Sequence, residues 1–279
     1  MKLLTKHLYI VSTPIGNLDD MTLRALEVLK NSDIILCEDT RRSIKLLSHY
    51  KIKKKLVPYH KFNEKKQHSK IIQYFNEGKI LSLISDAGTP LLSDPGRLLI
   101  NLCIKNNIKT IPIPGVSSII SAISVSGFSD QFLFYGFLPK TENELEKVLT
   151  SLSQNQTTQV FFVPANKINF YIKGFKKHFS GRKILVAKEI TKIYEEFLRD
   201  DIDQIKLFKN KVKGEITIVI SEKNIKSKKI DEEKIVNKAK KYLKKYSLKD
   251  TVSLILETEK INKKKVYDLC LKLKNENNF

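Results

Sequence analysis

Short apolar runs alternate with amphipathic stretches along the first part of the chain. The runs at 8–11 and 34–37 have the length and continuity of strands that are buried on both faces. The segment between them, 21–29, instead repeats apolar residues at helical spacing. This alternation predicts an α/β domain with a mainly parallel sheet. We expect strands at 8–11, 34–37, 56–57, 80–84 and 110–113, and helices at 21–29, 43–49, 67–75 and 97–105.

A second alternating series begins after a turn-rich segment. Pro112, Pro114 and Gly115 interrupt the pattern and indicate a domain boundary. The series predicts a second α/β domain, so we divide this part of the chain into domains 1–113 and 114–221. We expect strands at 132–135, 159–163, 183–187 and 215–220, and helices at 117–126, 141–153, 166–178 and 200–210.

The pattern changes again after Ser221. A polar, lysine-rich stretch at 222–229 precedes three segments with helical periodicity, at 231–246, 248–257 and 263–274, and Asn262 is a suitable N-cap for the third. No strand pattern continues, so residues 222–279 are expected to form a small helical domain that resembles a helix-turn-helix. This region contains 17 basic and 9 acidic residues.

The charge of the chain is ambiguous when it is taken alone. The net charge is +21, which favours a nucleic-acid partner. However, the 45 lysines accompany 33 isoleucines and 18 asparagines, all with A/T-rich codons, so compositional drift explains part of the excess. Arginine, which suits bidentate phosphate contacts, occurs only six times.

Composition also excludes several classes of protein. A 41% hydrophobic fraction excludes a wholly disordered chain, and no apolar run reaches the length of a membrane-spanning helix. The first residues lack a signal-peptide h-region. Three dispersed cysteines and five unclustered histidines predict no metal site and a reducing, cytoplasmic environment.

Several expected strands are followed by polar or turn-rich loops, at the edge where open α/β sheets bind ligands. The loop 85–96 holds two glycines, two prolines and two carboxylates that could accept hydrogen bonds from a ligand; it could equally be a structural crossover. The loop 13–17 has neither a Walker A nor a GxGxxG pattern. The segment 114–118 offers hydroxyls at a helix start, and 38–42 carries two acids and two of the six arginines.

Taken together, these loops resemble one family. VSTPIGNL at 11–18, EDTRR at 38–42, SDAGTPLLSDPG at 85–96, PGVSS at 114–118 and GFLP at 136–139 are similar, in this order, to the ribosomal RNA small subunit methyltransferase I family of the tetrapyrrole methylase superfamily. The resemblance is collinear over about residues 8–220. It implies two α/β domains with a cofactor cleft between them, a small C-terminal helical domain and a homodimer.

The resemblance also implies an activity and its residues. It implies that S-adenosylmethionine is the donor for methylation of the ribose 2′-hydroxyl of cytidine 1402 in 16S rRNA of the small ribosomal subunit. The implied cofactor contacts are Pro14, Ile15, Gly16, Asp86, Ala87, Gly88, Thr89, Pro90, Ser117, Ser118, Leu138, Ala187, Gly214 and Glu215. Candidate catalytic residues are Glu38, Asp39, Arg41, Asp94 and Lys188, and candidate RNA contacts are Arg42, His60, Lys192, Lys263, Lys264 and Lys265.

The chain departs from the family pattern in the second domain. Val163 stands where the family usually carries an acid, and Asn166-Lys167 replaces a His-Arg pair, so any role of those side chains is in doubt here. Lys188 replaces the usual arginine and keeps its charge.

The residues alone leave the proton acceptor and the substrate class open. A ribose hydroxyl is a weak acid, and Glu38, Asp39, Asp86 and Asp94 are all candidate bases. Candidate aromatic platforms for a splayed base are Tyr59, Phe62, Tyr135 and Phe137. The alternatives are a methylase that acts on a tetrapyrrole or on a translation elongation factor, and a non-catalytic RNA-binding protein.

Overall fold

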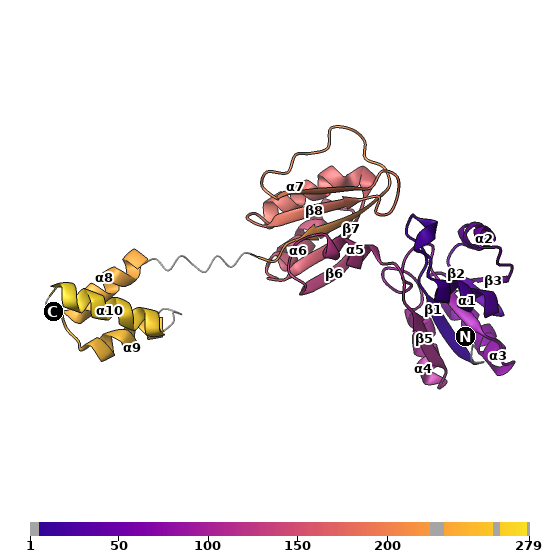
Figure 1. The fold of residues 1–279 in the computed structure, drawn as a ribbon, viewed down its shortest axis with the longest axis horizontal. Coiled ribbons are helices and arrows are strands. Elements are labelled where there is room, and N and C mark those ends of the chain that lie inside the picture. Colours follow the sequence, from indigo (N-terminus) through magenta and orange to yellow (C-terminus); the bar gives the residue numbers. More distant parts are fainter. Residues whose placement is uncertain (1–5, 224–231, 259–262, 278–279) are drawn as a thin grey trace. The chain divides into compact units, whose positions relative to one another are not determined.

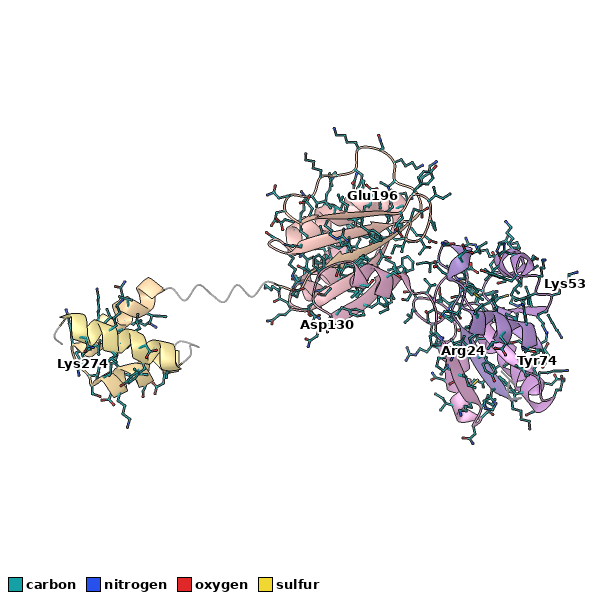
Figure 2. All side chains as sticks on the ribbon, viewed as in Figure 1. Arg24, Lys53, Tyr74, Asp130, Glu196 and Lys274 are labelled. Carbon is teal, nitrogen blue, oxygen red and sulfur yellow. The ribbon has the colours of Figure 1, made fainter. Side chains whose placement is uncertain are left out.

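The computed structural model describes residues 6–223, 232–258 and 263–277 of the chain. The chain divides into two compact units, with the boundary between Lys223 and Asn224 (Figure 1). Figure 2 adds the side chains that fill each unit. No helix in the described ranges is long and apolar enough to cross a membrane. Cys37, Cys103 and Cys270 are buried free thiols, and the described residues contain no group of three or more His, Cys, Asp or Glu side chains that could hold a metal ion.

The first sheet is wholly parallel, whereas the sequence predicts a mainly parallel one. Its strand order is β3-β2-β4-β1-β5, and every pair in it runs parallel. The strands are β1 (His7–Val11), β2 (Ile34–Cys37), β3 (Lys55–Pro58), β4 (Leu81–Ile84) and β5 (Lys109–Ile113). The helices that connect them are α1 (Leu23–Asn31), α2 (Thr40–His49), α3 (Glu64–Asn76) and α4 (Arg97–Lys105), and a short 3-10 turn, η1 (Leu18–Asp20), precedes α1.

Helices cover both faces of this sheet because its strands are apolar on both sides. Tyr9 and Ile35 point to the face where α1 and α2 pack, whereas their neighbours Leu8 and Ile34 point to the face covered by α3 and α4. All four side chains are buried. The continuous apolar runs of the sequence therefore correspond to strands buried between two helical layers.

The second sheet is mixed. Its order is β6-β7-β10-β8-β9; β6 and β7 are parallel, and the other three pairs are antiparallel. The strands are β6 (Phe132–Phe137), β7 (Thr158–Pro164), β8 (Lys183–Lys188), β9 (Glu196–Asp201) and β10 (Glu215–Ile220). The helix α5 (Ser118–Ser124) packs on one face, and α6 (Glu142–Ser153) and α7 (Ile168–His178) pack on the other; the turn η2 (Ala165–Lys167) precedes α7.

The helix predicted at 200–210 is wrong. Residues 196–201 form β9, which pairs with β8, and only a single turn follows, in which the Ile205 N–H donates to the Asp201 carbonyl at 3.0 Å. Ile202 and Ile205 are buried against the second core although the segment is not a helix. Their three-residue spacing is the same as that of apolar residues on one face of a helix. A buried irregular segment can show this spacing too, because its apolar side chains also point inward.

The second unit contains the three helices expected from the sequence. They are α8 (Glu232–Leu243), α9 (Leu248–Thr258) and α10 (Lys263–Asn277), and each packs against the other two. Ile235, Ala239, Val252, Ile255 and Cys270 form the centre of their common core. Asn262 and most of the polar stretch at 222–229 lie outside the described residues.

Candidate functional site

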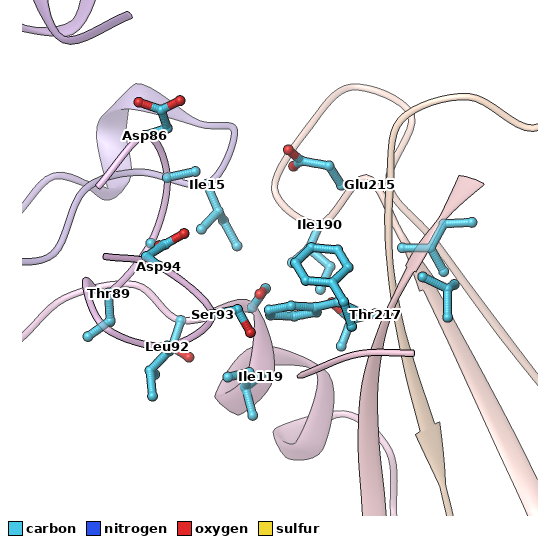
Figure 3. Close-up of a pocket in the computed structure, with 18 of the residues that line it drawn as sticks. Ile15, Asp86, Thr89, Leu92, Ser93, Asp94, Ile119, Ile190, Glu215 and Thr217 are labelled. Carbon is cyan, nitrogen blue, oxygen red and sulfur yellow. The ribbon is translucent and has the colours of Figure 1, made fainter. Parts of the chain in front are cut away.

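A cavity of about 390 Å³ lies at the carboxyl ends of the first sheet's strands, and one end of the second sheet forms its opposite side (Figure 3). It lies within the first unit. Polar residues line the side that belongs to the first sheet, and mostly apolar residues line the opposite side. The lining residues are Ile15, Glu38, Arg42, Asp86, Ala87, Gly88, Thr89, Leu92, Ser93, Asp94, Ser117, Ser118, Ile119, Phe137, Phe162, Val163, Pro164, Ile190, Gly214, Glu215, Ile216 and Thr217.

Direct hydrogen bonds join the loops on the first side. The backbones of Thr13 and Gly88 exchange two N–H to carbonyl hydrogen bonds of 2.9 Å, which tie the loop after β1 to the loop after β4. The Thr89 hydroxyl lies 3.0 Å from the Ser12 hydroxyl and 3.0 Å from the Val116 carbonyl, to which it donates. Three loops that are distant in sequence are therefore held as one surface.

The loop 85–96 needs unusual backbone conformations. Gly88 has φ +77°, and a Cβ at this position would lie 3.3 Å from the Ile15 side chain. Leu91 and Ser93 also have positive φ values, of 74° and 71°, which disfavour residues with a Cβ. At the end of the loop, the start of α4 is fixed because the N–H of the buried Gly96 donates to the buried Glu64 carboxylate at 2.7 Å. The loop is therefore anchored at both ends.

The opposite wall comes from the pairing of β7 with β10. Pro164, Val163 and Phe162 stand opposite Glu215, Ile216 and Thr217 in this antiparallel pair, and all six line the cavity. Phe137 and Phe162 pack together with ring centroids 5.3 Å apart. This wall gives the cavity a dry, aromatic side.

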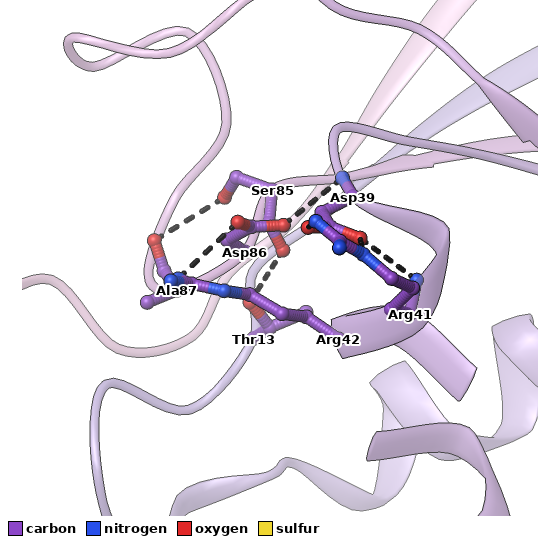
Figure 4. A network of polar contacts seen from close by, with 7 residues as sticks. All are labelled: Thr13, Asp39, Arg41, Arg42, Ser85, Asp86 and Ala87. Carbon is purple, nitrogen blue, oxygen red and sulfur yellow. Dashed lines mark hydrogen bonds and ion pairs between the residues drawn. The ribbon is translucent and has the colours of Figure 1, made fainter. Parts of the chain in front are cut away.

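Two of the four candidate bases are engaged in ion pairs (Figure 4). Asp39 caps α2 by accepting from the Arg41 N–H at 2.9 Å, and its carboxylate also binds the Arg41 guanidinium at 2.7 Å. These hydrogen bonds hold the pKa of Asp39 well below its usual range. The Asp86 carboxylate accepts from the Asp39 N–H at 3.1 Å and lies 3.3 Å from the Arg42 guanidinium.

The pKa values of the other two carboxyl groups, Glu38 and Asp94, are raised. Burial, reinforced by the nearby charge of Glu38, raises the pKa of Asp94 to about 6 although the Ser85 hydroxyl opposes the shift. Burial and the charge of Asp86 likewise raise the pKa of Glu38, against the opposing charges of Arg42 and His60. Asp94 and Glu38 both line the cavity, so they are the carboxylates there with increased basicity.

The structure brings together many of the residues expected at the site. Those that line the cavity are Ile15, Glu38, Arg42, Asp86, Ala87, Gly88, Thr89, Asp94, Ser117, Ser118, Gly214 and Glu215. Pro14, Gly16 and Lys192 line an adjacent hollow instead. Asp39, Arg41 and Pro90 are outside the lining, and the side chains of Leu138 and Ala187 lie in the hydrophobic cores.

The remaining expected contacts lie elsewhere. Lys188 pairs with Glu196 at 2.5 Å, outside the cavity lining. His60 is half-buried beside the exposed Phe62, with ring centroids 6.2 Å apart. The side chains of Lys263, Lys264 and Lys265 lie outside the described residues, although their backbone begins α10.

Sequence reasoning missed most of the apolar wall. Ile119, Ile216 and Thr217 line the cavity but carry no motif that marks a ligand site. The available signal was the position of Ile216 and Thr217 directly after Gly214 and Glu215, at the start of the strand expected at 215–220. Of the proposed stacking aromatics, Phe137 lines the cavity and is exposed, whereas Tyr59 is fully buried in the first core.

Comparisons with known proteins agree with this architecture. The family model described as "Tetrapyrrole (Corrin/Porphyrin) Methylases" matches residues 7–206. The ribosomal RNA small subunit methyltransferase I of Rickettsia prowazekii is 46% identical over 84% of this chain and 85% of its own length. The protein of the same name from Thermotoga maritima is 41% identical, and the match covers 77% of this chain but 98% of the relative.

A solved structure shares the fold at low sequence identity. The uroporphyrin-III C-methyltransferase of Thermus thermophilus, solved with S-adenyl homocysteine, superposes with a TM-score of 0.53 at 13% identity, covering 77% of this chain and 97% of the other. This likeness places the two sheets in a known architecture.

Proposed function

Because the chain belongs to the ribosomal RNA small subunit methyltransferase I family of tetrapyrrole methylases, we propose that it transfers a methyl group from S-adenosylmethionine to 16S rRNA. The proposed acceptor is the ribose 2′-hydroxyl of cytidine 1402 in the small ribosomal subunit. The observation that carries the proposal is the cavity where four loops of the first sheet meet the aromatic wall of the second.

The residues present fit this methyl donor. The volume of about 390 Å³ lies in the range of small-molecule sites. Glu38 and Asp94 place negative charge where a cationic donor would bind, and the missing Cβ of Gly88 leaves room beside Ile15. S-adenosylmethionine supplies an electrophilic methyl group when it is bound. The loops 12–17, 85–90 and 114–118 would hold it largely through backbone groups.

We assign the proton acceptor to Asp94. Its pKa of about 6 leaves it ionised at neutral pH but more basic than an ordinary aspartate, and it lines the cavity. Asp39 and Asp86 are less suited because Arg41 and Arg42 neutralise them. Glu38 supports Asp94, since its charge disfavours the ionised form of Asp94 and thereby raises its affinity for a proton.

The wall of the second sheet has a different role. Phe162 and Val163 exclude water from the reaction, which strengthens the electrostatic interactions inside the cavity. Phe137 is 60% exposed at the lining and offers a ring on which the base of the target nucleotide could stack. Positioning the hydroxyl in line with the methyl group would then account for most of the rate.

The same proposal covers the domain division, the cellular compartment and the oligomeric state of the protein. Residues 1–113 and 114–221 would act as separate domains, since each carries its own sheet. The family resemblance supports a cytoplasmic homodimer that acts on the assembled small subunit. Sedimentation velocity of the free protein tests the dimer.

The activity is tested by methyl transfer to small subunits that lack this modification. We expect one methyl group per subunit on cytidine 1402, mapped by mass spectrometry of rRNA digests, and loss of the product with Asp94→Asn. Transfer to a precorrin or to a protein instead would replace this function with another activity of the superfamily. Absence of donor binding in calorimetry would indicate a non-catalytic RNA-binding protein.

A further inference from the structure

A second hollow, of about 440 Å³, lies outside the catalytic cavity. It is formed by the segment from the end of β8 to the start of β9 and by the connection from β9 to β10; Glu196 marks the start of β9 in Figure 2. Four of its ten lining residues are lysines, two are glutamates, and one, Tyr194, carries an exposed aromatic ring. The lining residues are Lys188, Glu189, Tyr194, Glu196, Phe208, Lys209, Asn210, Lys211, Val212 and Lys213.

The acidic residues of this hollow are already paired. Glu196 lies 2.5 Å from the Lys188 ammonium, and Glu189 lies 2.9 Å from that of Lys192, which also contacts Glu215 at 3.1 Å. These pairs leave Lys209, Lys211 and Lys213 without compensation. All three are exposed, and within the part of the chain that the structure describes no carboxylate lies within 4 Å of their ammonium groups. The hollow therefore carries a local excess of positive charge.

The aromatic ring belongs to a loop with a defined shape. Tyr194 is 77% exposed, yet its loop is held by a 2.6 Å hydrogen bond from the Thr191 N–H to Glu195. The Thr191 hydroxyl also accepts from the Asn17 N–H at 3.0 Å, which connects this loop to the first sheet. An exposed ring on a hydrogen-bonded loop, beside unpaired lysines, has the combination that single-stranded nucleic acid requires, since phosphates need cations and splayed bases need stacking partners.

The hollow is continuous with the reaction site along the chain. Gly214 and Glu215 directly follow Lys213 and line the catalytic cavity. Gly214 has φ +89° and packs against the Glu189 side chain, which lines the second hollow. A strand that lies along the lysines would therefore lead toward the cavity without leaving the surface.

We propose that Lys209, Lys211, Lys213 and Tyr194 form a docking surface for a single-stranded RNA segment next to the methylated nucleotide. The lysines contact its phosphates, and Tyr194 stacks on one of its bases. The proposal rests on the proposed function, because the RNA is the substrate of that reaction. It adds a binding surface that is distinct from the catalytic cavity.

The test compares the wild type with the triple variant Lys209→Gln/Lys211→Gln/Lys213→Gln and with Tyr194→Ala, in methyl transfer to unmodified small subunits. We expect the triple variant to raise KM for the subunit about tenfold and to leave kcat within about twofold. Each lost phosphate contact should lower the slope of log KM against log salt by about 1, so the triple variant should lower it by about 2 to 3. Tyr194→Ala should raise KM without changing the slope, and Tyr194→Phe should keep the wild-type KM.

A matched control removes the same charge elsewhere. Lys51, Lys53 and Lys79 are exposed and precede the amino ends of β3 and β4, at the sheet edge opposite the cavity. Their triple glutamine variant should keep the wild-type KM and salt slope. Equal effects of the two triple variants would show that bulk charge alone attracts the RNA and would overturn the proposal.

Two further readouts separate the possible failures. Donor affinity, measured by calorimetry, should be the same in all variants. A wild type that binds the donor but does not methylate small subunits would overturn the proposed function, whereas normal wild-type activity with an unaffected Lys209/Lys211/Lys213 variant would overturn only the docking surface. A changed sedimentation coefficient of Tyr194→Ala would instead identify this surface as a protein interface.

Discussion

Replacing Asp94 with asparagine should stabilise the protein while it abolishes methyl transfer. The partly buried side chain keeps its size and loses only its ability to ionise. Burial and the charge of Glu38 raise the pKa of Asp94 from the ordinary 3.8 to about 6. A change of about 2 units corresponds to about 3 kcal/mol of unfavourable free energy for the ionised form in the folded state.

The sign and the pH window follow from this shift. Because the folded pKa lies above the unfolded one, the folded state binds the proton more tightly and loses stability as the pH rises from about 4 to about 6. The full penalty is present above pH 7. Solvent screening at this partly exposed group reduces the upper limit, so we expect Asp94→Asn to gain about 1 to 2 kcal/mol at pH 8 and about a third of that at pH 4.5.

Urea unfolding of the wild type and the variant at both pH values measures the effect. Asp130→Asn is the matched control, because Asp130 is exposed and lies outside the cavity lining, and this variant should show no comparable gain. In parallel, kcat/KM of the wild type should rise with pH to a plateau and reach half of the plateau value near pH 6. The assignment of Asp94 as a base with a raised pKa would be refuted by a variant that is no more stable than the wild type at pH 8, or by one that keeps its methyl-transfer activity.

Three further perturbations test other parts of the structure. Gly88→Ala should weaken donor binding about tenfold and cost about 1 to 2 kcal/mol of stability, whereas Gly78→Ala, which has a similar positive φ but open space around it, should leave calorimetric donor affinity unchanged. Glu64→Ala should lower the free energy of unfolding by about 2 kcal/mol because it removes the buried acceptor of the Gly96 N–H, and Glu64→Gln should lose less in the same urea assay. Deleting residues 224–279 should raise KM for small subunits about tenfold, since the tail carries excess positive charge. Donor affinity should stay intact, because 77% of this chain already matches 98% of the length of the Thermotoga relative. An unchanged KM would show that the tail does not contact rRNA.

The first domain was predictable because two independent sequence signals, apolar strands and the loops that follow them, indicate the same sheet. β1, β2 and β4 are mainly apolar, and β1, β2, β4 and β5 are followed by turn-rich or charged loops, so the sequence indicates both the parallel sheet and the edge where the site lies. The loop motifs place Glu38, Asp86 and Asp94 at that edge, and all three line the cavity. What could not be predicted is how the four acids divide into neutralised and basic groups, because this depends on the positions of Arg41 and Arg42 in space.

The second domain was harder to predict because its local signals conflict. β9 alternates weakly and ends in three polar residues, Arg199, Asp200 and Asp201, so it does not resemble a strand until β8 pairs with it. The apolar wall of the cavity has the same difficulty. Val163 and Ile216 are ordinary strand residues, and only their pairing across β7 and β10 turns them into the lining of a site.

The distribution of charge explains how one basic protein can accommodate a cationic donor and a polyanionic substrate. Glu38 and Asp94 line the cavity of a chain whose net charge is +21, so this side of the cavity favours a sulfonium and disfavours phosphate. The unpaired lysines of the β9–β10 connection lie outside that cavity, where phosphates remain hydrated and accessible. Arg42 lines the cavity, where it pairs with Asp86. The RNA backbone is therefore expected to stay on the lysine surface, so that only the target nucleotide enters the acidic cavity, where Asp94 can accept its proton.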